Sequence, residues 1–210
     1  MKLIDNTITQ FTNELASSSP APGGGSTAAV EATFGASLIA MVCELTIGNK
    51  KYEQCHEKAE NIKKSALVLK QELLETVDED TEAFNLVSAA FAMKKDTDEE
   101  KALRREAIQE GTKKCCEPPL KVVHKSYEGL LLANQLIDNY NTNTASDLGT
   151  GIVSLKSAAQ GAYFNVLINV NSIKDEEFVL KTKNEADEVY RNIIKLADEL
   201  YEKIINELDK

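Results

Sequence analysis

Pro20-Ala21-Pro22-Gly23-Gly24-Gly25-Ser26 leads directly into Thr27–Ile47, a run of small and apolar residues with the length and spacing of one long helix. Proline cannot continue a helix, and glycine permits positive φ angles that other residues rarely adopt. We expect Ser26 or Thr27 to cap the helix that follows, and Gly48 to end it. The stretch therefore predicts a sharp turn into an apolar helix.

The N-terminus of this helix is a candidate ligand site. Its first amide groups lack hydrogen-bond partners, and the aligned peptide dipoles favour negative charge there. A tight corner between two packed helices explains the same residues equally well. The stretch is not a Walker A loop, because no Lys-Ser or Lys-Thr pair follows the glycines. It is not a dinucleotide-binding motif, because no strand precedes it.

Apolar residues recur at helical spacing along most of the chain. One stripe runs from Ile4 to Leu15, and a second runs from Tyr52 to a helix end near Val77. Asp78-Glu79-Asp80 is then expected to open another helix, with its acids complementing the helix dipole. The last helix is predicted from about Asp175, with lysine and glutamate facing water.

Pro118-Pro119 interrupts the stretch from Asp98 to Tyr140, which is expected to form two helices or one kinked helix. Thr97 and Glu100 supply a capping box at its start. Val166–Val170 alone resembles a strand, but it continues the helical pattern before it. We therefore predict an all-α fold, an up-and-down bundle of antiparallel helices in a single domain spanning residues 1–210.

Two central helices carry small residues on one face. Small side chains let backbones approach closely, so we expect a tightly packed pair, either within the chain or across a dimer interface. We predict a homodimer, because helices that are apolar nearly all round need burial from every side. The small residues are Ala28, Ala32, Gly35, Ala36 and Ala40 in one helix, and Gly151, Ser154, Ala158, Gly161 and Ala162 in the other, which begins near Asp147.

Composition excludes several classes of partner. The net charge of -10 argues against nucleic acid, and no run of lysine or arginine forms a basic arm. The N-terminus lacks the pattern of a signal peptide, and acidic residues flank the longest apolar run, so no membrane segment is expected. The four cysteines have no Cys-x-x-Cys spacing, which favours a reduced, cytoplasmic protein.

Asp147 is a candidate general base, because the glycines beside it would let a ligand approach the backbone. The alternative is a capping box in which Asp147 pairs with Thr144, which would stabilise the helix by about 1 kcal/mol. Glu53-x-x-His56 has half the spacing of a di-iron motif, but its second half is absent, so no metal is predicted.

Asn165 and Asn169 lie four residues apart, so both amides point to one side of their helix and need partners. They could read the edge of a heterocycle, or bond to each other or to a facing helix. At about 1.5 Å per residue, Asn165 lies roughly 27 Å along the helix from Asp147. One small ligand therefore cannot contact both Asp147 and Asn165 within a subunit. A long ligand could contact both, and so could a ligand in a site shared between subunits.

Four stretches in the same order resemble the cyclodeaminase and cyclohydrolase family of folate enzymes, and the resemblance covers nearly the whole chain. The family includes formimidoyltetrahydrofolate cyclodeaminase domains and stand-alone methenyltetrahydrofolate cyclohydrolases, which are helical and dimeric. The stretches are Leu15–Ala29, Met41–Glu53, Val77–Phe84 and Gly161–Asn169.

The resemblance implies roles for individual residues. Asp147, in the Ser-Asp motif, is expected to be catalytic, and Lys51 matches a lysine of the family, although Asn49 replaces the lysine that usually stands two positions earlier. The folate substrate is expected to contact Pro22, Gly23, Gly24, Gly25, Ser26, Tyr52, Asn165 and Asn169.

The implied reaction is hydrolysis of 5,10-methenyltetrahydrofolate to 10-formyltetrahydrofolate, with water activated by Asp147 and with no permanently bound cofactor. A carboxylate suits proton removal and stabilises a passing positive charge. Two alternatives remain. One is a cyclodeaminase that releases ammonia, and the other is a folate-binding or scaffolding dimer without turnover.

Overall fold

The structure is a computed structural model that describes residues 2–210, and every regular element in that range is helical, which confirms the all-α prediction. Three short 3-10 turns, η1 (Leu3–Asp5), η2 (Lys50–Cys55) and η3 (Thr142–Thr144), precede α1, α3 and α6. The α-helices are α1 (Ile8–Leu15), α2 (Gly24–Ile47), α3 (His56–Ala92), α4 (Asp98–Lys114), α5 (Glu117–Leu136), α6 (Ala145–Val170) and α7 (Glu176–Leu208).

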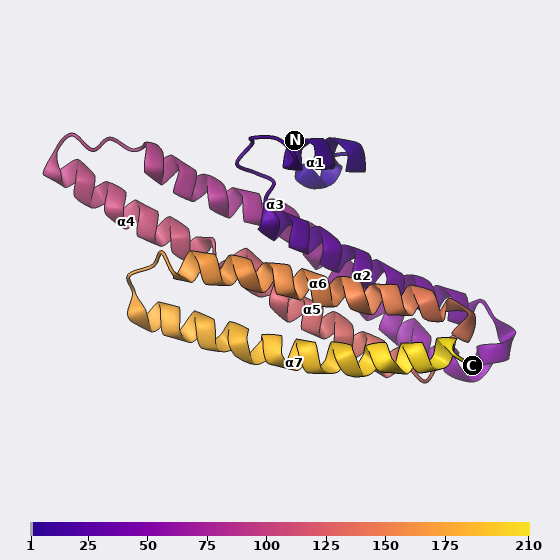
Figure 1. The fold of residues 1–210 in the computed structure, drawn as a ribbon. Helices are drawn as coiled ribbons and strands as arrows, with labels where there is room; N and C mark the ends of the chain where they lie inside the picture. The colour runs from indigo at the N-terminus through magenta and orange to yellow at the C-terminus, as the bar shows by residue number, and fades with distance from the viewer. Residues whose placement is uncertain (1) are drawn as a thin grey trace.

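Helices α2 and α6 lie side by side and antiparallel, near the centre of the bundle (Figure 1). A Cβ atom on Gly35 would lie only 2.9 Å from the carbonyl oxygen of Gly151 and 2.6 Å from the Cγ atom of Leu155. Such contacts exclude any larger residue at Gly35 without backbone movement. The predicted close pair of small-residue helices therefore lies within the chain.

Helix α3 is continuous for 37 residues, so the predicted helix end near Val77 is wrong. No glycine or proline interrupts the sequence there, and apolar residues at helical spacing resume with Phe84 and Val87. Asp78 and Asp80 consequently lie in the middle of a helix instead of at its start. Their carboxylates accept hydrogen bonds from other parts of the chain. These contacts are the basis of the candidate site below.

Most other predicted boundaries are confirmed. Pro118 and Pro119 lie in the first turn of α5, where a missing N–H costs nothing, so α4 and α5 are two helices. The capping box of Thr97 and Glu100 forms as expected, and Asp175 caps α7. The stripe beginning at Ile4 is divided into η1 and α1, because the residue before Ile8, Thr7, forms an N-terminal cap of its own.

Helix α2 is long and apolar enough, by length and composition alone, to cross a membrane. Half of its most apolar window is nevertheless buried inside the bundle, where α2 contacts α3 and α6. A core helix that neighbouring helices bury on every side has this composition.

Candidate active site at the N-terminus of helix α2

Helix α2 begins at Gly24, with Gly23 as its N-cap residue, so the cap position has no side chain to bond to the first amides. The predicted cap at Ser26 or Thr27 is therefore wrong. The Thr27 hydroxyl instead donates to the carbonyl oxygen of Gly23 at 2.8 Å. No glycine in residues 2–210 adopts a positive φ angle, so the glycines serve close approach and not an unusual backbone conformation.

The side chain that approaches this N-terminus is Asp80 from the middle of α3. The Ser26 hydroxyl donates a hydrogen bond to Asp80 Oδ2 at 2.7 Å. A Cβ atom on Gly25 would lie 2.8 Å from the same oxygen and still closer to Oδ1. The anion expected at the N-terminus of α2 is thus supplied by the protein itself, and Gly25 is required because any side chain would displace the carboxylate.

Burial raises the pKa of the Asp80 carboxyl above its ordinary value. Hydrogen bonds from the hydroxyl and the backbone N–H of Ser26 oppose this shift, since both favour the ionised form. A partly buried carboxyl with a raised pKa is suited to accepting a proton and returning it.

Two amides from α6 lie at the same end of the bundle. A Cβ atom on Gly24 would lie 3.0 Å from Asn165 Nδ2, which donates to the carbonyl oxygen of Gly161 in its own helix. Asn169 Nδ2 donates to the carbonyl oxygen of Cys115 at 2.7 Å. Burial and then the nearby Asp80 charge raise the pKa of the Cys115 thiol to about 11, so the thiol stays protonated at neutral pH.

A polar cavity of about 770 Å³ lies on the next face of α3, between that helix and the N-terminal segment that includes Ala21. Three residues that line it each contain a buried oxygen atom that lacks a hydrogen-bond partner within residues 2–210: Asn6 Oδ1, Asp78 Oδ2 and Thr81 Oγ1. The other Asp78 oxygen accepts from the backbone N–H of Leu3 at 2.6 Å. Each of the three atoms is itself buried, so a ligand in the cavity would reach them only after their side chains turned.

The other predicted site residues lie at the opposite end of α6. Tyr52 is buried, and its hydroxyl lies 3.0 Å from Thr142 Oγ1; this hydrogen bond lowers the pKa of the phenol. Lys51 is exposed, with its Nζ atom 5.4 Å from the centre of the Tyr52 ring. The structure therefore divides the predicted residues into two groups and does not bring them together within one chain.

Asp147 is half-buried at the third position of α6. The alternative explanation for it, a capping box with Thr144, is not realised. The Thr144 hydroxyl donates to the carbonyl oxygen of Asn141 at 2.7 Å instead. Across the described chain, residues 2–210, no hydrogen bond or ion pair engages the Asp147 carboxylate.

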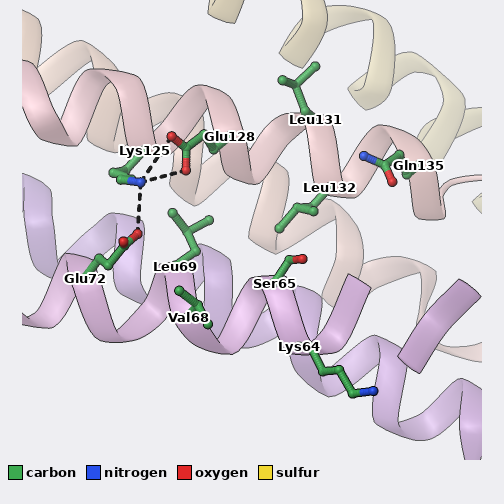
Figure 2. Close-up of a pocket in the computed structure, with 10 residues that line it drawn as sticks. All are labelled: Lys64, Ser65, Val68, Leu69, Glu72, Lys125, Glu128, Leu131, Leu132 and Gln135. Atoms are coloured by element: carbon green, nitrogen blue, oxygen red, sulfur yellow. Dashed lines mark hydrogen bonds and ion pairs between the residues drawn. The ribbon is translucent and has the colours of Figure 1, made fainter. Parts of the chain in front are cut away.

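A separate groove of about 560 Å³ between α3 and α5 contains none of the predicted residues (Figure 2). Lys125 bridges Glu72 and Glu128 at one end of it, and Val68 and Leu131 lie in its apolar part. Its two carboxylates are therefore already paired, which leaves no free carboxylate for chemistry. Within the described part of the chain, no three His, Cys, Asp or Glu side chains are grouped to hold a metal ion.

Sequence reasoning missed Asp80 because the acids at 78–80 were interpreted as the start of a helix. A signal was nonetheless present. The apolar stripe of α3 passes through Leu69, Leu73 and Val77, and the next position on that stripe is Asp80. A carboxylate on the buried face of a helix lowers the stability of the fold unless a hydrogen bond or an ion pair compensates for its burial, so such a residue points to a partner or a function.

Comparison with known proteins connects this arrangement to a family. Residues 7–188 match the family described as Formiminotransferase-cyclodeaminase. A methenyltetrahydrofolate cyclohydrolase of Methylorubrum extorquens is 34% identical over 200 residues, which cover 95% of this chain and 96% of that protein. The formimidoyltransferase-cyclodeaminase of Rattus norvegicus is 32% identical over 87% of this chain, which spans 34% of that longer protein.

The fold is also that of a solved relative. The crystal structure of formiminotetrahydrofolate cyclodeaminase from Thermotoga maritima superposes with a TM-score of 0.80 at 25% sequence identity, covering 95% of this chain and 98% of that one. Family match, full-length relative and shared fold agree with the resemblance seen in the four motifs. This chain therefore belongs to the formiminotransferase-cyclodeaminase family.

Proposed function

We propose that this chain hydrolyses 5,10-methenyltetrahydrofolate to 10-formyltetrahydrofolate at the N-terminus of α2, with Asp80 as the general base. The observation that carries the proposal is the Asp80 carboxyl, which is partly buried, has a raised pKa and is held by Ser26. The Methylorubrum extorquens relative, named for this activity and matched over nearly its whole length, supports the reaction.

In the proposed mechanism Asp80 accepts a proton from water as the water oxygen attacks the carbon that bridges N5 and N10. A tetrahedral adduct forms and the positive charge of the amidinium is neutralised. The bond from this carbon to N5 then breaks, its electron pair goes to N5, and Asp80 returns the proton there. The remaining hydroxyl proton leaves to solvent as the formyl group forms on N10. One carboxyl thus acts first as a base and then as an acid.

The residues around Asp80 have separate parts in this proposal. The backbone of Pro22–Ser26 and the Asn165 amide line the approach to the one-carbon bridge. Asn169 positions the α4–α5 junction through its bond to Cys115. The cavity beside Asp78 is the proposed position of the pterin ring.

Several predictions about the same function accompany this proposal. The enzyme works as a homodimer in the cytoplasm, and the folate is its substrate with no permanently bound cofactor. Asp147, Lys51 and Tyr52 remain predicted site residues at the other end of α6. Large apolar side chains exposed on α2 and α6, among them Phe34, Met41 and Phe164, support the dimer.

Product analysis with purified protein tests the proposal. We expect absorbance of methenyltetrahydrofolate to disappear faster than in buffer alone, with formation of 10-formyltetrahydrofolate and no ammonia. Loss of absorbance at the rate in buffer would contradict the assignment.

A second candidate is formimidoyltetrahydrofolate cyclodeaminase activity, which the Thermotoga maritima relative is named for. Here N10 attacks the formimino carbon and ammonia leaves, so a general acid is required. The raised pKa of Asp80 favours this candidate too, because it increases the protonated fraction. Release of ammonia from 5-formiminotetrahydrofolate would identify this activity.

Ser26→Ala is expected to shift the acid limb of the kcat/KM profile to higher pH. The serine hydroxyl favours the ionised form of Asp80, so its removal raises the pKa further, and the base is lost at a higher pH as the solution is acidified. Rates on the alkaline plateau should stay within a few-fold of wild type.

Ser37→Ala is the matched control, because the Ser37 hydroxyl bonds only to the Thr33 carbonyl oxygen of its own helix. Its acid limb should coincide with that of the wild type. A limb that stays in place in Ser26→Ala as well would show that Asp80 does not govern the rate.

A further inference from the structure

The first part of the chain, residues 2–22, is held to the bundle by few contacts, and we call it the N-terminal strap. Neither η1 nor α1 contains a buried residue, and α1 lies outside the bundle of long helices (Figure 1). Within residues 2–210, one hydrogen bond joins the strap to the remainder of the chain, from the backbone N–H of Leu3 to Asp78 Oδ1 at 2.6 Å. A segment with so few buried contacts opens more readily than the core of a fold.

Asp78, which accepts this bond, is an incompletely paired carboxylate. The residue is 8% exposed, and its Oδ2 atom has no hydrogen-bond partner in the described part of the chain. An unpaired oxygen on a buried carboxylate costs free energy, because water has been removed and no donor replaces it. Asn6 Oδ1 on the strap and Thr81 Oγ1 on α3 are unpaired in the same way. The contact between the strap and α3 is therefore one that a better-matched donor can replace.

The cavity beside Asp78 indicates the chemistry of that donor. Asp5, Glu14 and Glu82 line it together with Lys2, so its charged lining is mainly acidic. A carboxylate accepts best from two parallel N–H groups, one on each oxygen. The pyrimidine ring of a pterin carries such a pair, its 2-amino group and its N3–H.

We propose that Asp78 recognises the 2-amino and N3–H groups of the pterin, and that these groups replace the Leu3 N–H when the folate binds. This inference rests on the proposed function, which places the pterin ring in this cavity. Once the bond from Leu3 breaks, the carboxylate is free to turn into the cavity, where each of its oxygens gains a donor. The strap therefore competes with the ligand for Asp78. The cavity extends to Ala21, two residues before Gly23 at the N-terminus of α2, so its occupant lies close to the candidate active site.

Asp78→Asn tests the recognition. We expect it to bind 5-formyltetrahydrofolate about 10- to 100-fold more weakly in calorimetry, and to raise KM for methenyltetrahydrofolate by a similar factor. Asparagine has the same shape and can still accept the bond from Leu3, but its NH₂ group replaces the second acceptor. The unfolding midpoint of the same preparation checks that the variant is folded.

The 2-desamino-2-methyl analogue of 5-formyltetrahydrofolate separates recognition from a structural role, because it lacks only the 2-amino group. The wild type should bind this analogue about 10- to 100-fold more weakly than the parent compound. Asp78→Asn should bind the two compounds with nearly equal affinity. A variant that was merely damaged would bind both more weakly by the same factor.

Leu3→Pro tests the exchange without altering Asp78. Proline removes the N–H at the first residue of η1, and Lys2 already has the extended ψ angle of 149° that a residue before proline prefers. Leu3→Ala is the matched control, because it shortens the same side chain and retains the N–H. Leu3→Pro should bind 5-formyltetrahydrofolate about 2- to 10-fold more tightly than Leu3→Ala, since no donor competes for Asp78.

Two results would overturn the inference. Binding by Leu3→Pro that is no tighter than binding by Leu3→Ala would show that the strap does not compete with the ligand. Discrimination against the desamino analogue that persists in Asp78→Asn would assign recognition of the 2-amino group to another residue. A wild type that binds 5-formyltetrahydrofolate without hydrolysing methenyltetrahydrofolate refutes the proposed reaction alone, because binding is measured without turnover.

Discussion

Asp80→Asn is expected to lower kcat for hydrolysis by roughly 10²- to 10⁴-fold, the usual contribution of a positioned general base. An asparagine has the same shape, and its side-chain oxygen can still accept the hydrogen bond from Ser26. The unfolding midpoint should not fall, because the replaced carboxylate is one whose ionised form burial disfavours. Steady-state kinetics and thermal unfolding of the same preparation measure both quantities.

Glu79→Gln is the matched control for this variant. Glu79 is the preceding residue on α3, but its carboxylate pairs with Lys121 of α5 at 2.9 Å and not with Ser26. The pair is partly exposed and contributes about 0–1 kcal/mol, so activity should remain within about two-fold of wild type. If Asp80→Asn kept most of its activity, the base would have to be another group, and Asp147 would be the first to examine.

Gly25→Ala is expected to reduce kcat by about 100-fold and to destabilise the fold by roughly 1–3 kcal/mol. The new Cβ atom would overlap the Asp80 carboxylate, which must rotate away and lose its bond to Ser26. For a chain of this length that loss corresponds to a fall of about 2–12 °C in the unfolding midpoint. Kinetics and calorimetry report the two effects independently.

Gly23→Ala distinguishes crowding at Asp80 from a general intolerance of the glycine segment. A Cβ atom on Gly23 meets nothing within 4 Å, and its φ angle of -128° is accessible to alanine. Its unfolding midpoint should match that of the wild type. Equal destabilisation by both alanines would contradict the account of why Gly25 must be glycine.

Periodicity and turn residues were sufficient to predict most of the fold. The Thr97 capping box, the Asp175 cap and the break at Pro118-Pro119 are local features, and local signals determined them correctly. The interruption at residues 78–80 was predicted wrongly, because acidic residues suit both a helix start and a helix interior. The sequence has no glycine or proline there to end the helix, and the hydrogen-bond partners of Asp78 and Asp80 come from distant parts of the chain.

Only part of the candidate site could be predicted from the sequence. The glycine segment and the Asn165 amide could be identified from motifs and spacing, and the structure brings them together. Asp80 could not be placed there, because its contact with Ser26 joins residues 54 positions apart. The separation of Asp147 from this group follows from helix length alone, and it is this separation that makes a second subunit relevant.

A structure of the protein bound to 5-formyltetrahydrofolate, a stable analogue, tests the central claim most directly. We predict the one-carbon group within hydrogen-bond reach of the Asp80 carboxylate, directly or through one water, and beside the backbone of Gly24 and Gly25. An analogue bound beside Tyr52 with no path to any Asp80 carboxylate would contradict the account.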